Sequence, residues 1–168
     1  MRRHLDFFLC VAISVLLTGC AGPSYTYRYV PGKTAVLSGG RATAPEAAPP
    51  AVHAAIAAGN RIAGLPYGYG CGHGCNIDTA YDCSGAAAFV LREAGLLPAE
   101  MQSSTAFRNY GERGAGDWIS VYARRGHVFL VVAGVRFDTG WTHGAEGPQW
   151  TTQNRPAGGS VIRHPAGL

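Results

Sequence analysis

Lysine and long apolar runs are both scarce in this sequence of 168 residues. Lys33 is the single lysine, and no block of Lys and Arg with interleaved aromatic residues suggests binding to a nucleic acid. The apolar run at residues 9–17 is shorter than the roughly 20 residues that a membrane-spanning helix needs. The net charge of +4 permits an acidic polymer or an anionic lipid surface as partner but requires neither. We therefore expect no nucleic-acid partner.

The first 20 residues have the features of an export signal. Arg2 and Arg3 precede the apolar run, which has the length of a signal-peptide core. The run ends in Leu17-Thr18-Gly19-Cys20, which resembles the lipobox of bacterial lipoproteins. This resemblance implies that residues 1–19 are removed, that Cys20 is lipidated, and that the protein is anchored at the periplasmic face of a bacterial membrane. The alanine after Cys20 permits sorting to an outer membrane, and an ordinary signal peptide or a short anchor helix is the alternative.

The next 30 residues differ in composition from the rest of the chain. Residues 21–50 are rich in Gly, Pro, Ala, Ser and Thr, which leaves little to bury in a core. We predict a lipidated N-terminus and flexible tether over residues 20–50, with a reach on the order of 30 Å. One domain over residues 51–168 should then contain the core.

Export also limits what the cysteines can do. Two of the five belong to the signal and the lipidation site, so Cys71, Cys75 and Cys83 remain. In an oxidising compartment Cys71 and Cys75 can form a disulfide, which leaves Cys83 unpaired. A zinc site that adds His73 to these three cysteines is the alternative, but its spacing differs from the usual Cys-x2-Cys pairs. We therefore expect no metal and no other cofactor.

Cys83 opens an alanine-rich apolar segment, and this pattern predicts a helix from Cys83 to about Ala94 that ends at Gly95. The first turn of a helix presents unpaired N–H groups and the positive end of the dipole, so it stabilises a thiolate. We interpret Cys83 as a nucleophile, with a buried structural cysteine as the alternative. A second helix is predicted at residues 51–63, where Pro50 is a natural start signal.

The C-terminal half predicts strands. His127 begins a strongly apolar, β-branched run, and a strand end at a sheet rim can hold a side chain rigidly beside an open cleft. His127 is therefore the candidate base for Cys83, although a histidine that merely caps a strand edge is the alternative. Residues 141–156 predict a long loop, and residues 105–110 a short helix. The predicted strands are 118–123, 127–133, 135–139 and 160–164.

Four short motifs now occur in a recognisable order: Pro66-Tyr67, Asp82-Cys83-Ser84-Gly85, Gly116-Asp117 and Gly126-His127-Val128. Over residues 51–139 this order and spacing resemble the NlpC-type cell-wall peptidases, which are papain-like enzymes. The resemblance implies an α+β fold in which N-terminal helices, including the nucleophile helix, pack on an antiparallel sheet. It also implies hydrolysis of amide bonds in peptidoglycan stem peptides through an acyl-enzyme, at the D-γ-glutamyl–diaminopimelate bond or a related one. We expect a monomer.

The resemblance also assigns roles to residues. Cys83 would be the nucleophile and His127 the base that takes its proton. The backbone N–H of Cys83, with Tyr67 nearby, would stabilise the oxyanion. Asp82 and Ser84 would help to hold the amine of the stem peptide, or would instead cap the helix.

The group behind His127 departs from the family pattern. Family members usually place a histidine about a dozen residues after the base, but Thr139 occupies that position here. Alignment on Gly134 brings Asp138 to the same place, and a carboxylate can accept the ring N–H and stabilise the imidazolium. We therefore predict Asp138 as the third group, with Thr139 and His143 as alternatives.

Two other functions remain compatible with the motifs. A non-catalytic lipoprotein could use the same cleft to bind stem peptides or a protein partner. A thiol acyltransferase could form the same acyl-enzyme and transfer it to a nucleophile other than water. The presence of both Cys83 and His127 argues against the binding module, because binding alone does not need the pair.

Overall fold

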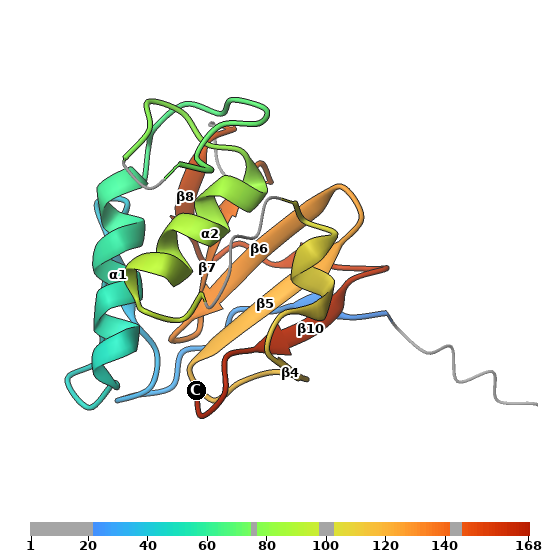
Figure 1. The fold of residues 1–168 in the computed structure, drawn as a ribbon. Helices are drawn as coiled ribbons and strands as arrows, with labels where there is room; N and C mark the ends of the chain where they lie inside the picture. Colours follow the sequence, from blue (N-terminus) through green and yellow to red (C-terminus); the bar gives the residue numbers. More distant parts are fainter. Residues whose placement is uncertain (1–21, 75–76, 98–102, 142–145) are drawn as a thin grey trace, which may run out of the picture.

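The computed structural model describes residues 22–74, 77–97, 103–141 and 146–168. The fold class is α+β, as expected. Helices α1 (Pro50–Ile62) and α2 (Cys83–Glu93) pack against each other, and both contact the sheet. Figure 1 shows the two helices together on one face of the sheet.

The main sheet is antiparallel and has six strands in the described part of the chain. Two smaller pairs, β1 with β9 and β2 with β3, lie outside it, and a 3-10 helix η1 (Ala106–Asn109) precedes β4. In spatial order the main strands are β4 (Glu112–Arg113), β10 (Val161–His164), β5 (Ile119–Arg124), β6 (His127–Val132), β7 (Val135–Thr139) and β8 (Pro148–Thr151). The small pairs are β1 (Ser24–Tyr25) with β9 (Arg155–Pro156), and β2 (Val36–Ser38) with β3 (Arg41–Thr43).

The helix that begins at Cys83 is confirmed at both ends. Asp82 caps it, because its Oδ1 accepts a hydrogen bond from the Gly85 N–H at 2.7 Å. Gly85 must lack a side chain, since a Cβ there would lie 2.2 Å from the Cys71 carbonyl oxygen. At the other end Gly95 takes a φ of 71°, which ends the helix. Residues 84–91 are buried, so the helix is part of the core.

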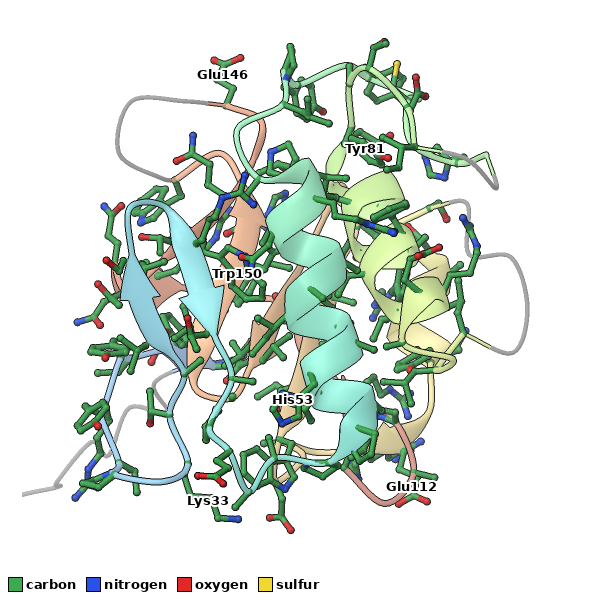
Figure 2. The ribbon with its side chains drawn as sticks, turned by 90° about the vertical axis from the view of Figure 1, so that its left-hand side faces the viewer. Lys33, His53, Tyr81, Glu112, Glu146 and Trp150 are labelled. Atoms are coloured by element: carbon green, nitrogen blue, oxygen red, sulfur yellow. The ribbon has the colours of Figure 1, made fainter. Side chains whose placement is uncertain are left out.

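The predicted helix at residues 51–63 is also confirmed, as α1. Gly59 faces Trp150 of β8 so closely that a Cβ would meet its ring at 2.5 Å. Trp150 in turn packs on Phe137 of β7 at a centroid distance of 4.7 Å. Figure 2 shows Trp150 beside α1. This close approach attaches α1 to the β8 edge of the sheet.

The three central strands and the final strand are confirmed to within about a residue at each end. Along β6 the residues alternate: Val128 and Leu130 face the main core with the helices, while Phe129 faces a second cluster with Tyr25 and Ala157. Both faces of the sheet are therefore covered. The short helix predicted near residues 105–110 is present as η1.

The prediction of a long loop over residues 141–156 is wrong for its second half. Pro148–Thr151 forms β8 and pairs with β7, and Arg155–Pro156 forms β9. The Gly- and Thr-rich composition does not predict these strands, because they are stabilised by residues that are distant in the sequence. The Trp150 contacts with α1 and β7 are the main example.

The prediction of a flexible tether is wrong for residues 22–49. Tyr25 in β1 is only 4% exposed, and its hydroxyl donates a hydrogen bond to the Gly134 carbonyl at 2.9 Å. Further along, the Ala35 N–H donates to the Ala133 carbonyl at 2.8 Å. The segment lacks large apolar residues for a core of its own, but it docks on a sheet face that the rest of the chain supplies. In Figure 1 this blue segment lies against the sheet, so the domain begins near Ser24 and not at residue 51.

The expected signal at residues 1–19 and the lipidation site Cys20 lie outside the described residues. Within those residues, no helix has the length and hydropathy to cross a membrane. The lipoprotein assignment therefore remains a prediction from the sequence.

We expect a protein that begins at Ala51 to be less stable than one that begins at Gly22 by about 3 kcal/mol or more. Loss of residues 22–50 would expose Phe129 and remove the buried Tyr25, and each large buried side chain contributes about 1.5–3 kcal/mol. Chemical denaturation of both proteins measures this difference. Tyr25→Phe in the longer protein is the control, because it removes one hydrogen bond and should cost only about 1 kcal/mol. Equal stability of the two proteins would mean that the segment contributes nothing.

Candidate active site

Cys83 and His127 meet where the first residue of α2 lies beside the first residue of β6. The two side chains lie close enough that Cys83 is among the groups that raise the pKa of His127. The hairpin between β5 and β6 pairs Arg124 with His127 across a two-residue turn, and Gly126 in that turn takes a φ of 78°. This tight turn fixes His127 at the end of the strand, beside the N-terminus of the nucleophile helix.

Asp138 of β7 holds the far side of the His127 ring. Its Oδ1 lies 2.8 Å from Nε2 of His127, which leaves Nδ1 as the ring nitrogen for the Cys83 thiol. Thr139, the first alternative, has no hydrogen bond to His127 in the described structure, and His143 lies outside the described residues. His127 thus lies between Cys83 and Asp138 and is hydrogen-bonded to Asp138, and we call this arrangement the Cys83–His127–Asp138 chain.

The environment of His127 favours its protonated form. Burial lowers the pKa of the ring, but the hydrogen bonds to Asp138 and Cys83 and the charge of Asp138 outweigh burial. The positive charge of Arg155 opposes them in part. The net result is a pKa of His127 above its usual value of 6.5. A base with these partners can take a proton from the thiol and keep it in a stabilised imidazolium.

Two buried arginines hold the Asp138 carboxylate, and sequence reasoning missed both. Nη1 of Arg136 and Nη1 of Arg155 each donate to Oδ2 of Asp138, the second at 2.5 Å. Arg136 is fully buried, and burial lowers its pKa while the charge of Asp138 partly offsets this. The alternation Arg136-Phe137-Asp138 in a strand places the two charged residues on one face, and this signal could have revealed the pair.

Asp82 and Ser84 are both occupied within the protein. Oδ1 of Asp82 accepts from the Gly85 N–H and from the Ser84 hydroxyl at 3.0 Å. Its Oδ2 accepts from the Gly70 N–H at 3.0 Å and lies 3.2 Å from Nε2 of His73. Burial raises the pKa of Asp82, but these hydrogen bonds lower it below the usual range. The helix-capping role is therefore present in the structure, and a role in binding an amine stays a prediction.

Two cavities flank the Cys–His pair. The first, of about 410 Å³, contains Cys83, Asp82 and Ser84 in its wall, and the second, of about 310 Å³, contains His127. Tyr67 borders both. The remaining lining residues of the first are Tyr69, Gly70, His73, Ser103, Ser104 and Gly126, and those of the second are Thr139, Gly140, Trp141, Glu146 and Arg155. Because Tyr67 borders both, the two cavities adjoin, with Cys83 in the wall of one and His127 in the wall of the other.

Tyr67 lines the same cavity as Cys83, and its oxyanion role stays a prediction. A parallel bridge to Tyr81, two residues before Cys83, positions its backbone. Burial raises the pKa of the Tyr67 hydroxyl, and the nearby Cys83 and Asp82 add to this effect. The side chain is 42% exposed and remains a proton donor at neutral pH.

The predicted Cys71–Cys75 disulfide involves Cys75, which lies outside the described residues. Within them, Cys71 and Cys83 pair with no other cysteine. In the same part of the chain no three His, Cys, Asp or Glu side chains are placed to share a metal ion. The zinc alternative also requires Cys75, so the disulfide and the absence of a metal both stay predictions.

No protein-family model matches this chain, and no curated protein matches it significantly. The function must therefore be argued from the geometry of the site. A thiol at a helix N-terminus, beside an imidazole that a carboxylate holds, is an arrangement that suits nucleophilic acyl transfer.

Proposed function

We propose that this protein is a papain-like cysteine peptidase that hydrolyses amide bonds in the stem peptides of peptidoglycan. The observation that carries the proposal is the Cys83–His127–Asp138 chain at the junction of two cavities. The reaction type follows from this geometry. The substrate class is inferred from the motif resemblance to NlpC-type enzymes.

In the acylation step His127 takes the thiol proton at Nδ1, and the Cys83 sulfur attacks the carbonyl carbon. The carbonyl oxygen becomes an oxyanion near the unpaired N–H of Cys83 at the helix start and the Tyr67 hydroxyl. His127 then gives its proton to the amide nitrogen, the C–N bond breaks, and the amine leaves. Asp138 keeps the ring oriented and stabilises its charge throughout.

In the deacylation step water replaces the amine. His127 takes a proton from the water, whose oxygen attacks the thioester carbon. The C–S bond breaks, the proton on His127 returns to the Cys83 sulfur, and the product leaves as a carboxylic acid that loses its proton to solvent.

This mechanism assigns each half of the substrate to one of the two cavities. The acyl half of the substrate stays bonded to Cys83, so it occupies the first cavity, where Asp82 can attract an amine. The amine half receives its proton from His127, so it occupies the second cavity. Asp82 would have to exchange His73 or Gly70 for the substrate amine at Oδ2.

The test is to incubate a protein that begins at Gly22 with purified muropeptides and to identify the products by mass spectrometry. We expect the release of shortened stem peptides, with a new amine on one product and a new carboxylate on the other. Binding without cleavage would favour the non-catalytic module, and transfer to an added amine in preference to water would favour the acyltransferase.

We also propose that Cys20 carries a lipid that holds the enzyme at the membrane. Ser24, the first residue of β1, follows Cys20 by four positions, and a step of four residues spans at most about 14 Å. The domain would therefore work close to its membrane and not at the end of a long tether. Cys20→Ser should move the full chain from the membrane fraction to the soluble fraction, as measured by fractionation and immunoblotting. A variant that stays with the membrane would contradict lipid anchoring through Cys20.

A further inference from the structure

The groups around Asp138 carry an unbalanced charge. Arg136 and Arg155 share one carboxylate, so the described cluster contains two guanidinium groups and one carboxylate. Buried charges in proteins are normally paired, because leaving one unpaired in a low-dielectric site is costly. The cluster therefore favours an additional anion.

The two arginines differ in how many of their side-chain nitrogens already donate hydrogen bonds within the protein. Arg136 uses all three side-chain nitrogens: Nε donates to the Gln153 carbonyl, Nη2 to the Trp141 carbonyl, and Nη1 to Asp138. Arg155 uses Nη1 alone, which donates to Asp138 and, at 3.2 Å, to the Gly140 carbonyl. Its Nε and Nη2 have no acceptor among the described residues.

Arg155 also borders the second cavity, whereas Arg136 does not. Its side chain is 9% exposed, and the guanidinium lies over the Trp141 ring at 5.7 Å from the centroid. Trp141 itself is 55% exposed and forms an apolar wall of the same cavity. Glu146 on the rim makes no ion pair with Arg155 in the described structure, so it does not neutralise the guanidinium. Figure 2 shows Glu146 at the end of the molecule where Tyr81 leads into α2.

We propose that Arg155 and Trp141 form a subsite for the leaving half of the substrate, and that this half must carry a free carboxylate. The inference rests on the proposed function, because it is His127 that assigns the second cavity to the leaving amine. The Arg155 guanidinium is held by Asp138 through Nη1, and the residue lines the second cavity. A carboxylate there would balance the second arginine and be recognised by charge-assisted hydrogen bonds.

The test compares two tripeptides, L-Ala-γ-D-Glu-diaminopimelate with free carboxylates on the diaminopimelate and the same peptide with both as carboxamides. The wild-type enzyme should cleave the carboxylate form with a kcat/KM at least about tenfold higher. Arg155→Gln should lose this preference to within about twofold. If Arg155 acted only by holding Asp138, the variant would slow both peptides equally and keep the preference, which would overturn the proposal.

Two further arms make the result specific. Arg125→Gln removes a positive charge from the exposed β5–β6 turn beside His127 and should keep the full preference. Calorimetric binding of both tripeptides to Cys83→Ala requires no cleavage, so it separates this inference from the proposed function. If the wild type cleaves neither peptide, the proposed function fails. In that case the subsite is supported if Cys83→Ala binds the carboxylate form more tightly and Cys83→Ala/Arg155→Gln does not. Equal binding of both peptides by Cys83→Ala would contradict it.

Discussion

Cys83→Ala is expected to reduce the rate of stem-peptide cleavage by at least about a thousandfold, to the background of the assay. In the proposed mechanism the thiol forms the bond to the substrate carbonyl, and Cys83 is the thiol that interacts with His127 in the described structure. Alanine is a good helix former, and Asp82 still caps the helix in the variant, so the fold should be retained. Mass spectrometry of digested muropeptides measures the loss, and circular dichroism checks the fold.

Cys71→Ala is the matched control for this experiment. Cys71 is a partly buried cysteine close to the N-terminus of α2, where its carbonyl accepts the Asp82 N–H at 3.2 Å. Its side chain has no place in the Cys83–His127–Asp138 chain, so cleavage should stay within about threefold of wild type. Substantial cleavage by Cys83→Ala would refute the covalent mechanism.

Asp138→Asn is expected to reduce kcat/KM by about a hundredfold or more. The asparagine cannot stabilise an imidazolium by charge, and its amide group can point an N–H at Nε2 and so favour the wrong tautomer of His127. It also leaves Arg136 and Arg155 buried without their counter-charge. Breaking a buried ion pair in this way typically costs about 3–5 kcal/mol, so the assay must run well below the melting temperature of the variant.

The pH profile separates the role of Asp138 in orienting His127 from a purely structural one. His127 must be unprotonated to act as base, and its raised pKa places the acid limb of the wild-type kcat/KM profile above pH 6.5. Without the charge of Asp138, burial of the ring lowers the pKa, so the acid limb of Asp138→Asn should move to lower pH. An unchanged acid limb would mean that Asp138 does not set the protonation of His127.

Thr139→Val tests the alternative third group with little change in volume. Thr139 is buried and borders the second cavity, but the hydrogen bond to His127 comes from Asp138. Cleavage by this variant should stay within about threefold of wild type. A loss as large as that of Asp138→Asn would transfer the orienting role to Thr139.

The local features of the site could be read from the sequence because short-range physics determines them. Asp82-Cys83 before an alanine-rich run specifies a capped helix with a thiol at its start, and Gly95 specifies its end. The β-branched run after Gly126 specifies a strand that His127 begins. Hydrogen-bond partners within a few residues and side-chain periodicity are enough for each of these features.

Features that depend on distant partners could not be read in this way. Tyr25 lies in a segment whose composition predicts a tether, yet its ring packs with Phe129 and its hydroxyl donates to the Gly134 carbonyl. Arg155 follows a Gly- and Thr-rich stretch whose composition predicts no strand. It lies in β9, which pairs with β1, and its Nη1 donates a hydrogen bond to Asp138. Composition measures what a segment can bury by itself, and these segments bury their residues against other elements.

The sequence by itself determined the two partners of the proposed reaction, a cysteine at a helix start and a histidine at a strand start. It also narrowed the third group to a few candidates near residue 138. Only the tertiary structure decided that Asp138 contacts the ring, that two arginines hold its carboxylate, and that one of them, Arg155, borders the second cavity. The physical reason is that capping and strand propensity act over a few residues, whereas buried charges find their partners only when the whole chain is folded.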